Sequence, residues 1–162
     1  HKYIKIKYLC GNTSIGKKIK PHPLLDKKGN LIIFPKNKKK IIFCFPRANT
    51  SGCNLEAQQF ETLNSVFNQN NYNIYGLCSD SPKKIELMSE KCNISYDLLS
   101  DESQDFLKYI GVIGIKKMYG KEYEGIIRST LVCDEKDIIT HVFEKVSPSG
   151  HAQKVADTLN IK

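Results

Sequence analysis

The sequence of 162 residues has no tryptophan, only two methionines and no long hydrophobic run. A membrane-spanning helix needs roughly 18 or more apolar residues in a row, so we expect neither an integral membrane protein nor a membrane partner. The six cysteines form no C-x-x-C pair, which a zinc ribbon requires, and they are too sparse for a secreted disulfide scaffold. Such scattered thiols favour a reducing, intracellular compartment.

Acidic side chains are almost missing from the first quarter of the chain. Residues 1–40 carry 12 lysines against one acid, Asp26, a net charge of +11, whereas residues 41–162 carry 13 basic and 16 acidic side chains, a net charge of −3. We therefore predict a basic N-terminal arm over residues 1–20 and one domain over residues 21–162. The arm suits non-specific DNA contact or nuclear import, and a solvated tail is the simpler alternative. Because the chain begins at His1, a targeting segment upstream stays open, and with it a cytosolic or organellar location.

Strand and helix patterns alternate along the chain. The apolar run Ile41–Phe45, which ends at Pro46, predicts a buried central strand. A polar turn at 26–30 between two apolar pairs predicts an N-terminal β-hairpin. Further strands are expected at 74–78, near 98–99, at 127–133 and at 138–143, and helices from Thr50, over 82–92, around 104–110 and over 148–159. This order predicts an α/β fold with a mixed central sheet flanked by helices.

The segment from Pro46 to Cys53 joins the predicted central strand to the helix that follows. Thr50 is a good N-cap residue, which places Cys53 in the first helical turn, where free backbone N–H groups and the helix dipole favour a thiolate. Glu56 would complete a capping box at the helix entry. From these residues alone, a buried structural cysteine behind an ordinary threonine cap stays an open alternative.

The spacing Pro46-x-x-x-Thr50-x-x-Cys53 resembles the active-site motif of the peroxiredoxins. The similarity is strongest to the bacterioferritin-comigratory (PrxQ) branch and covers roughly residues 21–160. The segments that carry it further are Ser79–Ser81, Leu98–Asp101, Lys117–Gly120, Gly125–Thr130 and Gly150–Ala152. The resemblance implies a thioredoxin-like fold and reduction of hydrogen peroxide or organic hydroperoxides, with no cofactor and no metal.

The resemblance also assigns roles to four side chains. Cys53 would be the peroxidatic nucleophile, and Thr50 would hydrogen-bond the thiolate and the peroxide. Pro46 would shield the pocket from water, and Arg128, on the predicted strand 127–133, would stabilise the thiolate and polarise the peroxide. Arg128 has the fixed fork of donors that two oxygens require, although by itself it would pass for a surface residue. Arg47, the second arginine, is expected to be solvated.

Recycling of the oxidised cysteine needs another thiol. Many PrxQ proteins carry a resolving cysteine five residues after the peroxidatic one, where this chain has Gln58, and others carry it at a position that aligns with Ser89. We favour a one-Cys mechanism in which thioredoxin, glutaredoxin or glutathione reduces the sulfenic acid, with Cys92 as a possible internal resolving thiol. The remaining cysteines, Cys44, Cys78 and Cys133, are expected to pack in the core, whereas Cys10 lies in the arm. A monomer or weak dimer is expected.

Three weaker signals remain. Residues 11–18 nearly match a phosphate-binding loop but lack its terminal hydroxyl, so we regard the match as coincidental. The four histidines are isolated, which argues against a metal site. The tyrosine-rich segment 118–123 either walls the active site or forms a surface loop.

The rival interpretation of the whole chain is a nucleic-acid- or chromatin-associated protein that uses the basic arm and in which the thiol is incidental.

Overall fold

The structure is a computed structural model that describes residues 15–161. The arm up to residue 14, with Cys10 and the first half of segment 11–18 that resembles a phosphate-binding loop, lies outside the described residues. The elements in chain order are β1 (Leu24–Leu25), β2 (Leu31–Ile32), β3 (Lys39–Cys44), α1 (Ser51–Gln69), β4 (Tyr72–Cys78), α2 (Pro82–Cys92), β5 (Asp97–Ser100), α3 (Asp105–Tyr109), β6 (Ile113–Met118), β7 (Lys121–Ile126), β8 (Ser129–Cys133), β9 (Ile139–Phe143) and α4 (His151–Thr158).

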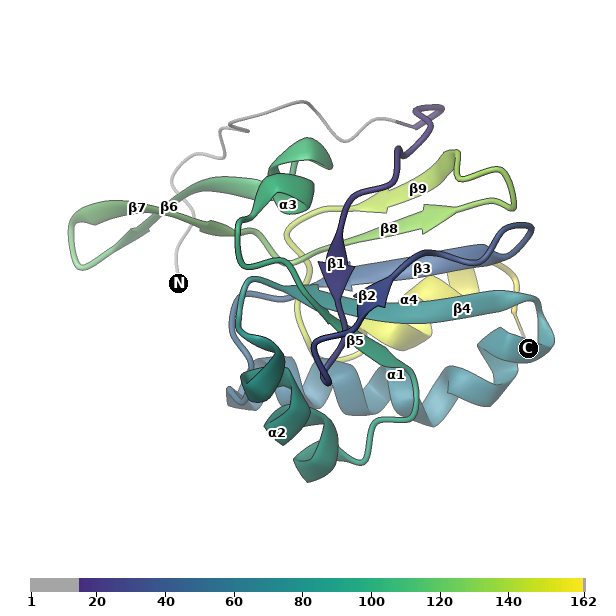
Figure 1. Cartoon of the computed structure of the whole chain (residues 1–162), viewed down its shortest axis with the longest axis horizontal. Helices are drawn as coiled ribbons and strands as arrows, with labels where there is room; N and C mark the ends of the chain where they lie inside the picture. The colour runs from purple at the N-terminus through teal and green to yellow at the C-terminus, as the bar shows by residue number, and fades with distance from the viewer. Residues whose placement is uncertain (1–14, 162) are drawn as a thin grey trace.

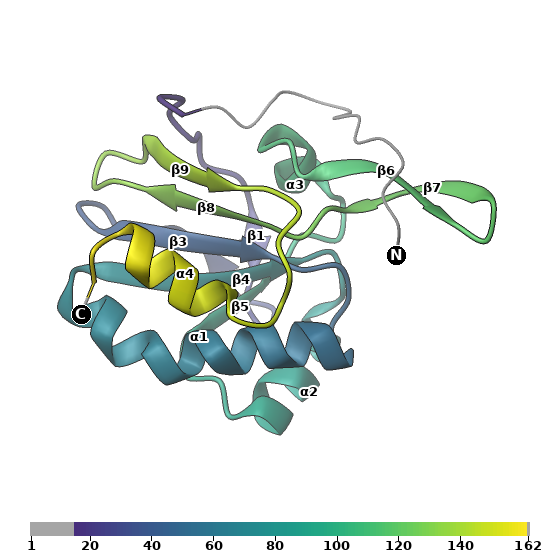
Figure 2. The same ribbon diagram turned by 180° about the vertical axis from the view of Figure 1, so that it is seen from behind.

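Seven strands form one mixed sheet in the order β2-β1-β5-β4-β3-β8-β9. Strands β3, β4 and β5 run parallel, whereas β8 pairs antiparallel with both β3 and β9. Helices α1 and α4 lie side by side on the face that is nearer the viewer in Figure 2, and α3 lies toward the opposite face, nearer in Figure 1. The expected mixed α/β sandwich and the N-terminal β1–β2 hairpin are therefore confirmed.

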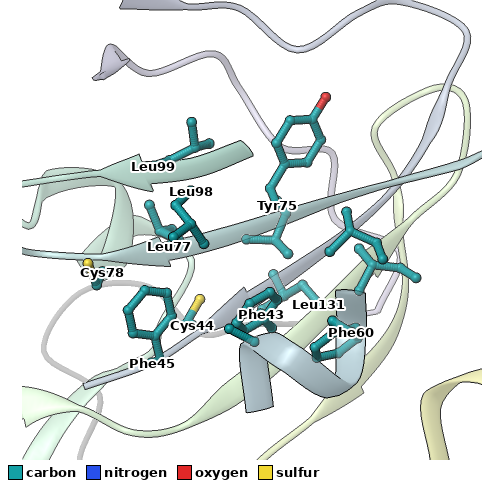
Figure 3. Close-up of a cluster of buried hydrophobic side chains, with 14 of the residues drawn as sticks. Phe43, Cys44, Phe45, Phe60, Tyr75, Leu77, Cys78, Leu98, Leu99 and Leu131 are labelled. Carbon is teal, nitrogen blue, oxygen red and sulfur yellow. The ribbon is translucent and has the colours of Figure 1, made fainter. Parts of the chain in front are cut away.

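The packing between β3 and α1 fixes the start of that helix. The ring of Phe43 stacks on Phe60 with centroids 4.5 Å apart and an interplanar angle of 13° (Figure 3). Gly76 on β4 leaves the space that the Phe43 ring occupies, since a Cβ there would lie 2.8 Å from Phe43 Cζ and 2.6 Å from Leu98 Cδ2. The aromatic stack thus holds α1 against the sheet, with its N-terminus at the carboxyl end of β3.

The hairpin β6–β7 is the main element that the sequence did not predict. It forms a separate two-stranded sheet that projects from the body, at the left of Figure 1. Its turn consists of Tyr119 and Gly120, both with positive φ (52° and 79°), as a tight hairpin turn requires. The segment expected to be a pocket wall or a loop is the tip of this hairpin.

Two boundaries also differ from the expectation. The strand expected at 127–133 begins at Ser129, so Arg128 lies in the short connection between β7 and β8 rather than within a strand. The last helix begins at His151 instead of Pro148, because Gly150 adopts a left-handed conformation (φ 80°) as its N-cap. No helix among residues 15–161 is long and apolar enough to cross a bilayer.

Candidate active site

Cys53 lies in the first turn of α1, and its side chain is only 1% exposed. The loop that leads to it is tied to the neighbouring chain segment, because the backbone N–H of Ala48 donates to Asp80 Oδ2 at 2.7 Å and that of Phe45 to the Leu77 carbonyl at 3.0 Å. These bonds fix the loop across the carboxyl ends of β3 and β4. The thiol is therefore held at the edge of the sheet where α/β folds place their sites.

The entry of α1 differs from the expected capping box. Thr50 is the N-cap residue, but its Oγ1 donates to the carbonyl of Arg47 at 3.0 Å and makes no side-chain capping bond. Glu56 does not reach back to the helix entry either, since its carboxylate pairs with Arg128. The predicted capping box is wrong, because a charged partner far along the chain binds the glutamate more strongly than a backbone N–H would.

Arg128 bridges the thiol and a buried carboxylate. Its Nη2 donates to Cys53 Sγ at 3.4 Å, and its Nη1 donates to Glu56 Oε1 at 2.7 Å. The Glu56 side chain is fully buried and that of Arg128 is 13% exposed. Burial raises the pKa of the Glu56 carboxyl to about 7, although the charge and hydrogen bond of Arg128 oppose the rise. The guanidinium fork is thus oriented by an acid on one side and presented to the sulfur on the other.

Glu56 is a site residue that sequence reasoning placed wrongly. It lies three residues after Cys53, a spacing that puts two side chains on the same face of a helix. That spacing was the available signal, because a glutamate on the buried face of a helix needs a cationic partner.

The residues named from the motif converge on one pocket of about 500 Å³. Pro46, Thr50, Cys53 and Arg128 all line it, together with Lys116, Met118 and Tyr123 from the β6–β7 hairpin. The hairpin therefore forms a wall of the pocket. Of the two expectations for segment 118–123, the pocket wall is confirmed. Arg47 is exposed, as expected, at the pocket's lining.

Lys116 is the second site residue that the sequence did not reveal. It lies on β6 and is only 2% exposed. The pKa of its ammonium group is lowered to about 8, first by burial and then by the charges of Arg128 and Arg47, while Cys53 opposes the shift. Nothing in the local sequence distinguishes this lysine from the other 22 in the chain.

Four other cysteines among the described residues are buried, and none forms a disulfide. Burial raises the pKa of the thiols of Cys44, Cys78 and Cys133, in the last case to about 12. These three pack in the core as expected. Cys92, at the end of α2, is 6% exposed, and burial raises its thiol pKa as well. Among residues 15–161, no cluster of histidine, cysteine or acidic side chains has the arrangement of a metal site.

Comparison with known proteins shows the family to which the chain belongs. The model of the AhpC/TSA family matches residues 15–142. The chain belongs to the AhpC/TSA family. It is 34% identical over 123 residues to a putative peroxiredoxin Bcp of Helicobacter pylori, covering 76% of this chain and 81% of the relative. It is 30% identical over 119 residues to the peroxiredoxin Bcp of Escherichia coli, covering 74% and 76%.

Solved structures place this peroxiredoxin in the PrxQ branch. A PrxQ of Xylella fastidiosa superimposes with a TM-score of 0.86 at 27% identity, covering 91% of this chain and 96% of that one. The bacterioferritin comigratory protein of Xanthomonas campestris, whose structures concern alkyl peroxide reduction, gives 0.81 at 28% identity, covering 86% and 90%. The peroxiredoxin is therefore a thioredoxin-fold thiol peroxidase. These relatives are bacterial, so they lend no support to the nuclear location expected from the basic arm.

Proposed function

We propose that this peroxiredoxin reduces hydrogen peroxide and organic hydroperoxides with Cys53 as its nucleophile. The Cys53 thiolate attacks the terminal peroxide oxygen, an S–O bond forms as the O–O bond breaks, and the remaining alkoxide or hydroxide takes a proton to leave as alcohol or water. The observation that carries this assignment is the Arg128 guanidinium 3.4 Å from the Cys53 sulfur in a pocket lined by the motif residues.

The other motif residues take supporting roles in this proposal. Preorganised donors in a water-poor pocket stabilise the charge that develops on the two oxygens, and Arg128 supplies them. Pro46 closes one wall against solvent. A contact of Thr50 with the thiolate or the peroxide requires its hydroxyl to turn away from the Arg47 carbonyl, to which it now donates.

We further propose a one-Cys cycle in which thioredoxin, glutaredoxin or glutathione attacks the sulfenic acid, releasing water and leaving a mixed disulfide. The position of Cys92 supports this choice over internal resolution. Its thiol on α2 is only 6% exposed and burial raises its pKa, and both disfavour the accessible thiolate that internal resolution needs. Cys92 remains the alternative resolving residue.

Replacement of Cys53 by serine tests the assignment. We expect Cys53→Ser to abolish peroxide turnover with an unchanged melting temperature, and the matched variant Cys44→Ser at a core thiol to keep its turnover if it folds. Mass spectrometry after one equivalent of peroxide distinguishes the cycles: a sulfenic acid on Cys53 indicates the one-Cys mechanism, and a Cys53–Cys92 disulfide indicates internal resolution. Turnover retained by the Cys53→Ser protein would contradict the assignment.

We propose a second, compatible role for the basic segment as a non-specific contact to DNA phosphates in an intracellular compartment, the nucleus included. The charge of +11 over residues 1–40 supports it, as do the exposed lysines Lys18, Lys20 and Lys36. Lys40 does not contribute, because it is buried and pairs with Asp137. Salt-dependent binding to duplex DNA that is lost when residues 1–20 are deleted would assign the contact to the arm, and the absence of salt-dependent binding by the whole chain would contradict the role. Sedimentation tests the expected monomer or weak dimer.

A further inference from the structure

The charges around Cys53 do not balance with the motif residues alone. Arg128 contributes one positive charge, and the fully buried Glu56 carboxylate, 2.7 Å from its Nη1, takes up much of it. When Cys53 is a thiolate and Glu56 has lost its proton, which its pKa of about 7 places above neutral pH, the buried site contains two anions and one cation. An uncompensated buried charge is costly, so a second cation is needed if the thiolate and Glu56 are to be ionised together.

Lys116 is the candidate for this second cation. Its side chain lines the same pocket as Cys53 and Arg128 and is 2% exposed. Its stem passes over the opposite strand of the hairpin at Gly125, where a Cβ would lie 3.3 Å from Lys116 Cδ and 3.8 Å from Cε. A residue larger than glycine at position 125 would push this stem aside. The hairpin is thus built to carry the lysine inward.

Side chains alternate between the two faces of β6, and Lys116 lies on the face toward the pocket. Lys116 and Met118 both line the pocket, whereas Lys117 between them does not, as side chains on opposite faces of a strand require. Charged and titratable groups reach the pocket from each element around Lys116. They are Arg47 from the loop before α1, Cys53 from α1, Tyr123 and Glu124 from β7, and Arg128 from the connection between β7 and β8. Glu56, also on α1, acts on the pocket through its ion pair with Arg128.

We propose that Lys116 is a positioning residue of the peroxidase site, whose ammonium group balances the share of the Cys53 thiolate charge that Arg128, already paired with Glu56, leaves uncompensated. The proposal rests on the assignment of Cys53 as the nucleophile. Because Glu56 ionises near pH 7 and burial lowers the pKa of Lys116 to about 8, this contribution is greatest between pH 7 and 8 and is lost as the pH rises through 8.

The rate at which iodoacetamide alkylates Cys53, followed from pH 5 to 10 with the labelled residue located by mass spectrometry, measures the thiolate directly and without peroxide. We expect Lys116→Met to move the midpoint of this curve up by about one pH unit, since a nearby cation shifts a thiol by that order. The matched variant Lys117→Met, one residue along the same strand, should leave the midpoint unchanged.

A further variant separates charge from packing. Lys116→Arg keeps a cation on a different stem, so its midpoint should remain near that of the unaltered protein. Equal shifts for Lys116→Met and Lys116→Arg, or no shift for Lys116→Met, would overturn the proposal. The second-order rate with peroxide should fall for Lys116→Met at pH 7–8, where Glu56 is ionised and Lys116 still carries charge, and should approach that of the unaltered protein above pH 8. If Cys53 alkylation shifts as expected but peroxide does not oxidise Cys53 in any variant, the proposed nucleophile is wrong and the electrostatic role stands.

Discussion

At the scale of single residues, two buried titratable groups have environments that change their protonation in opposite directions. Glu56 is a carboxyl whose pKa is raised by burial to about 7, against an ordinary 4.5. His151 is an imidazole whose pKa is lowered to about 4, against an ordinary 6.5, by burial first and then by Lys154 and Arg128. Each shift makes the stability of the fold depend on pH, with opposite signs.

Between pH 4.5 and 7 the folded protein binds a proton at Glu56 that the unfolded chain has released. Stability from this group is therefore complete below pH 4.5 and is lost as the pH rises through 7. Relative to Glu56→Gln, the unaltered protein should lose about 3 kcal/mol of unfolding free energy over this interval. Urea denaturation at a series of pH values measures the difference, and Glu102→Gln at an exposed carboxyl should track the unaltered protein. A pH-independent difference between the first two proteins would contradict the buried position of Glu56.

His151 is neutral in the fold, where its Nε2 lies 2.7 Å from Thr130 Oγ1 and its ring packs edge-on against Phe60 and Phe143. Between pH 6.5 and 4 the unfolded chain takes up a proton that the folded protein does not. The unaltered protein should therefore lose about 3 kcal/mol relative to His151→Gln as the pH falls across this range. Thermal unfolding at pH 4, 5.5 and 7 tests this. A similar pH-dependent gain from His141→Gln, at a partly exposed histidine on β9, would show that the effect is not specific to the buried ring.

At the scale of elements, the contact between β4 and β3 depends on the absence of a side chain at Gly76. An added Cβ would meet Leu98 Cδ2 at 2.6 Å and Phe43 Cζ at 2.8 Å. Because a packed core resists added volume, Gly76→Ala should cost about 1–3 kcal/mol of unfolding free energy. The same change made in a Phe43→Leu background should cost less, since the smaller side chain frees the space. Equal costs in both backgrounds, measured by urea denaturation, would mean that Phe43 does not set the clash.

The strands that the sequence predicts most directly are those buried in the middle of the main sheet. Strands such as β3 and β4 are nearly continuous runs of buried apolar residues, and their composition alone identifies them. The β6–β7 hairpin escaped prediction because β7 (Lys121–Ile126) is mostly exposed and lacks an apolar face. Its turn also begins with Tyr119, a residue type that seldom adopts positive φ and so gives no turn signal.

At the scale of the whole molecule, the site combines residues that the chain carries far apart. Pro46, Thr50 and Cys53 lie within one short segment, so their spacing is legible in the sequence. Arg128 was found only through the resemblance to a family. Glu56 was placed in the wrong partnership and Lys116 was not singled out, because their roles come from a pairing across 72 residues and from a hairpin that folds over the pocket. Contacts between residues so far apart in the chain cannot be predicted from local sequence patterns.

The burial of the Cys53 thiol has a consequence for the lifetime of its oxidised form. With 1% of the side chain exposed, a sulfenic acid on Cys53 is sheltered until a reductant reaches it through the pocket. On the proposed mechanism, we expect a protein as large as thioredoxin to need a wider local opening of the chain around this sulfur than a tripeptide needs, because the thiol is almost fully buried. A long wait for that opening would give a second peroxide time to convert the sulfenic acid to a sulfinic acid. If Cys53 is the proposed nucleophile, the packing around it would therefore affect both the choice of reductant and the susceptibility of the enzyme to inactivation by its own substrate.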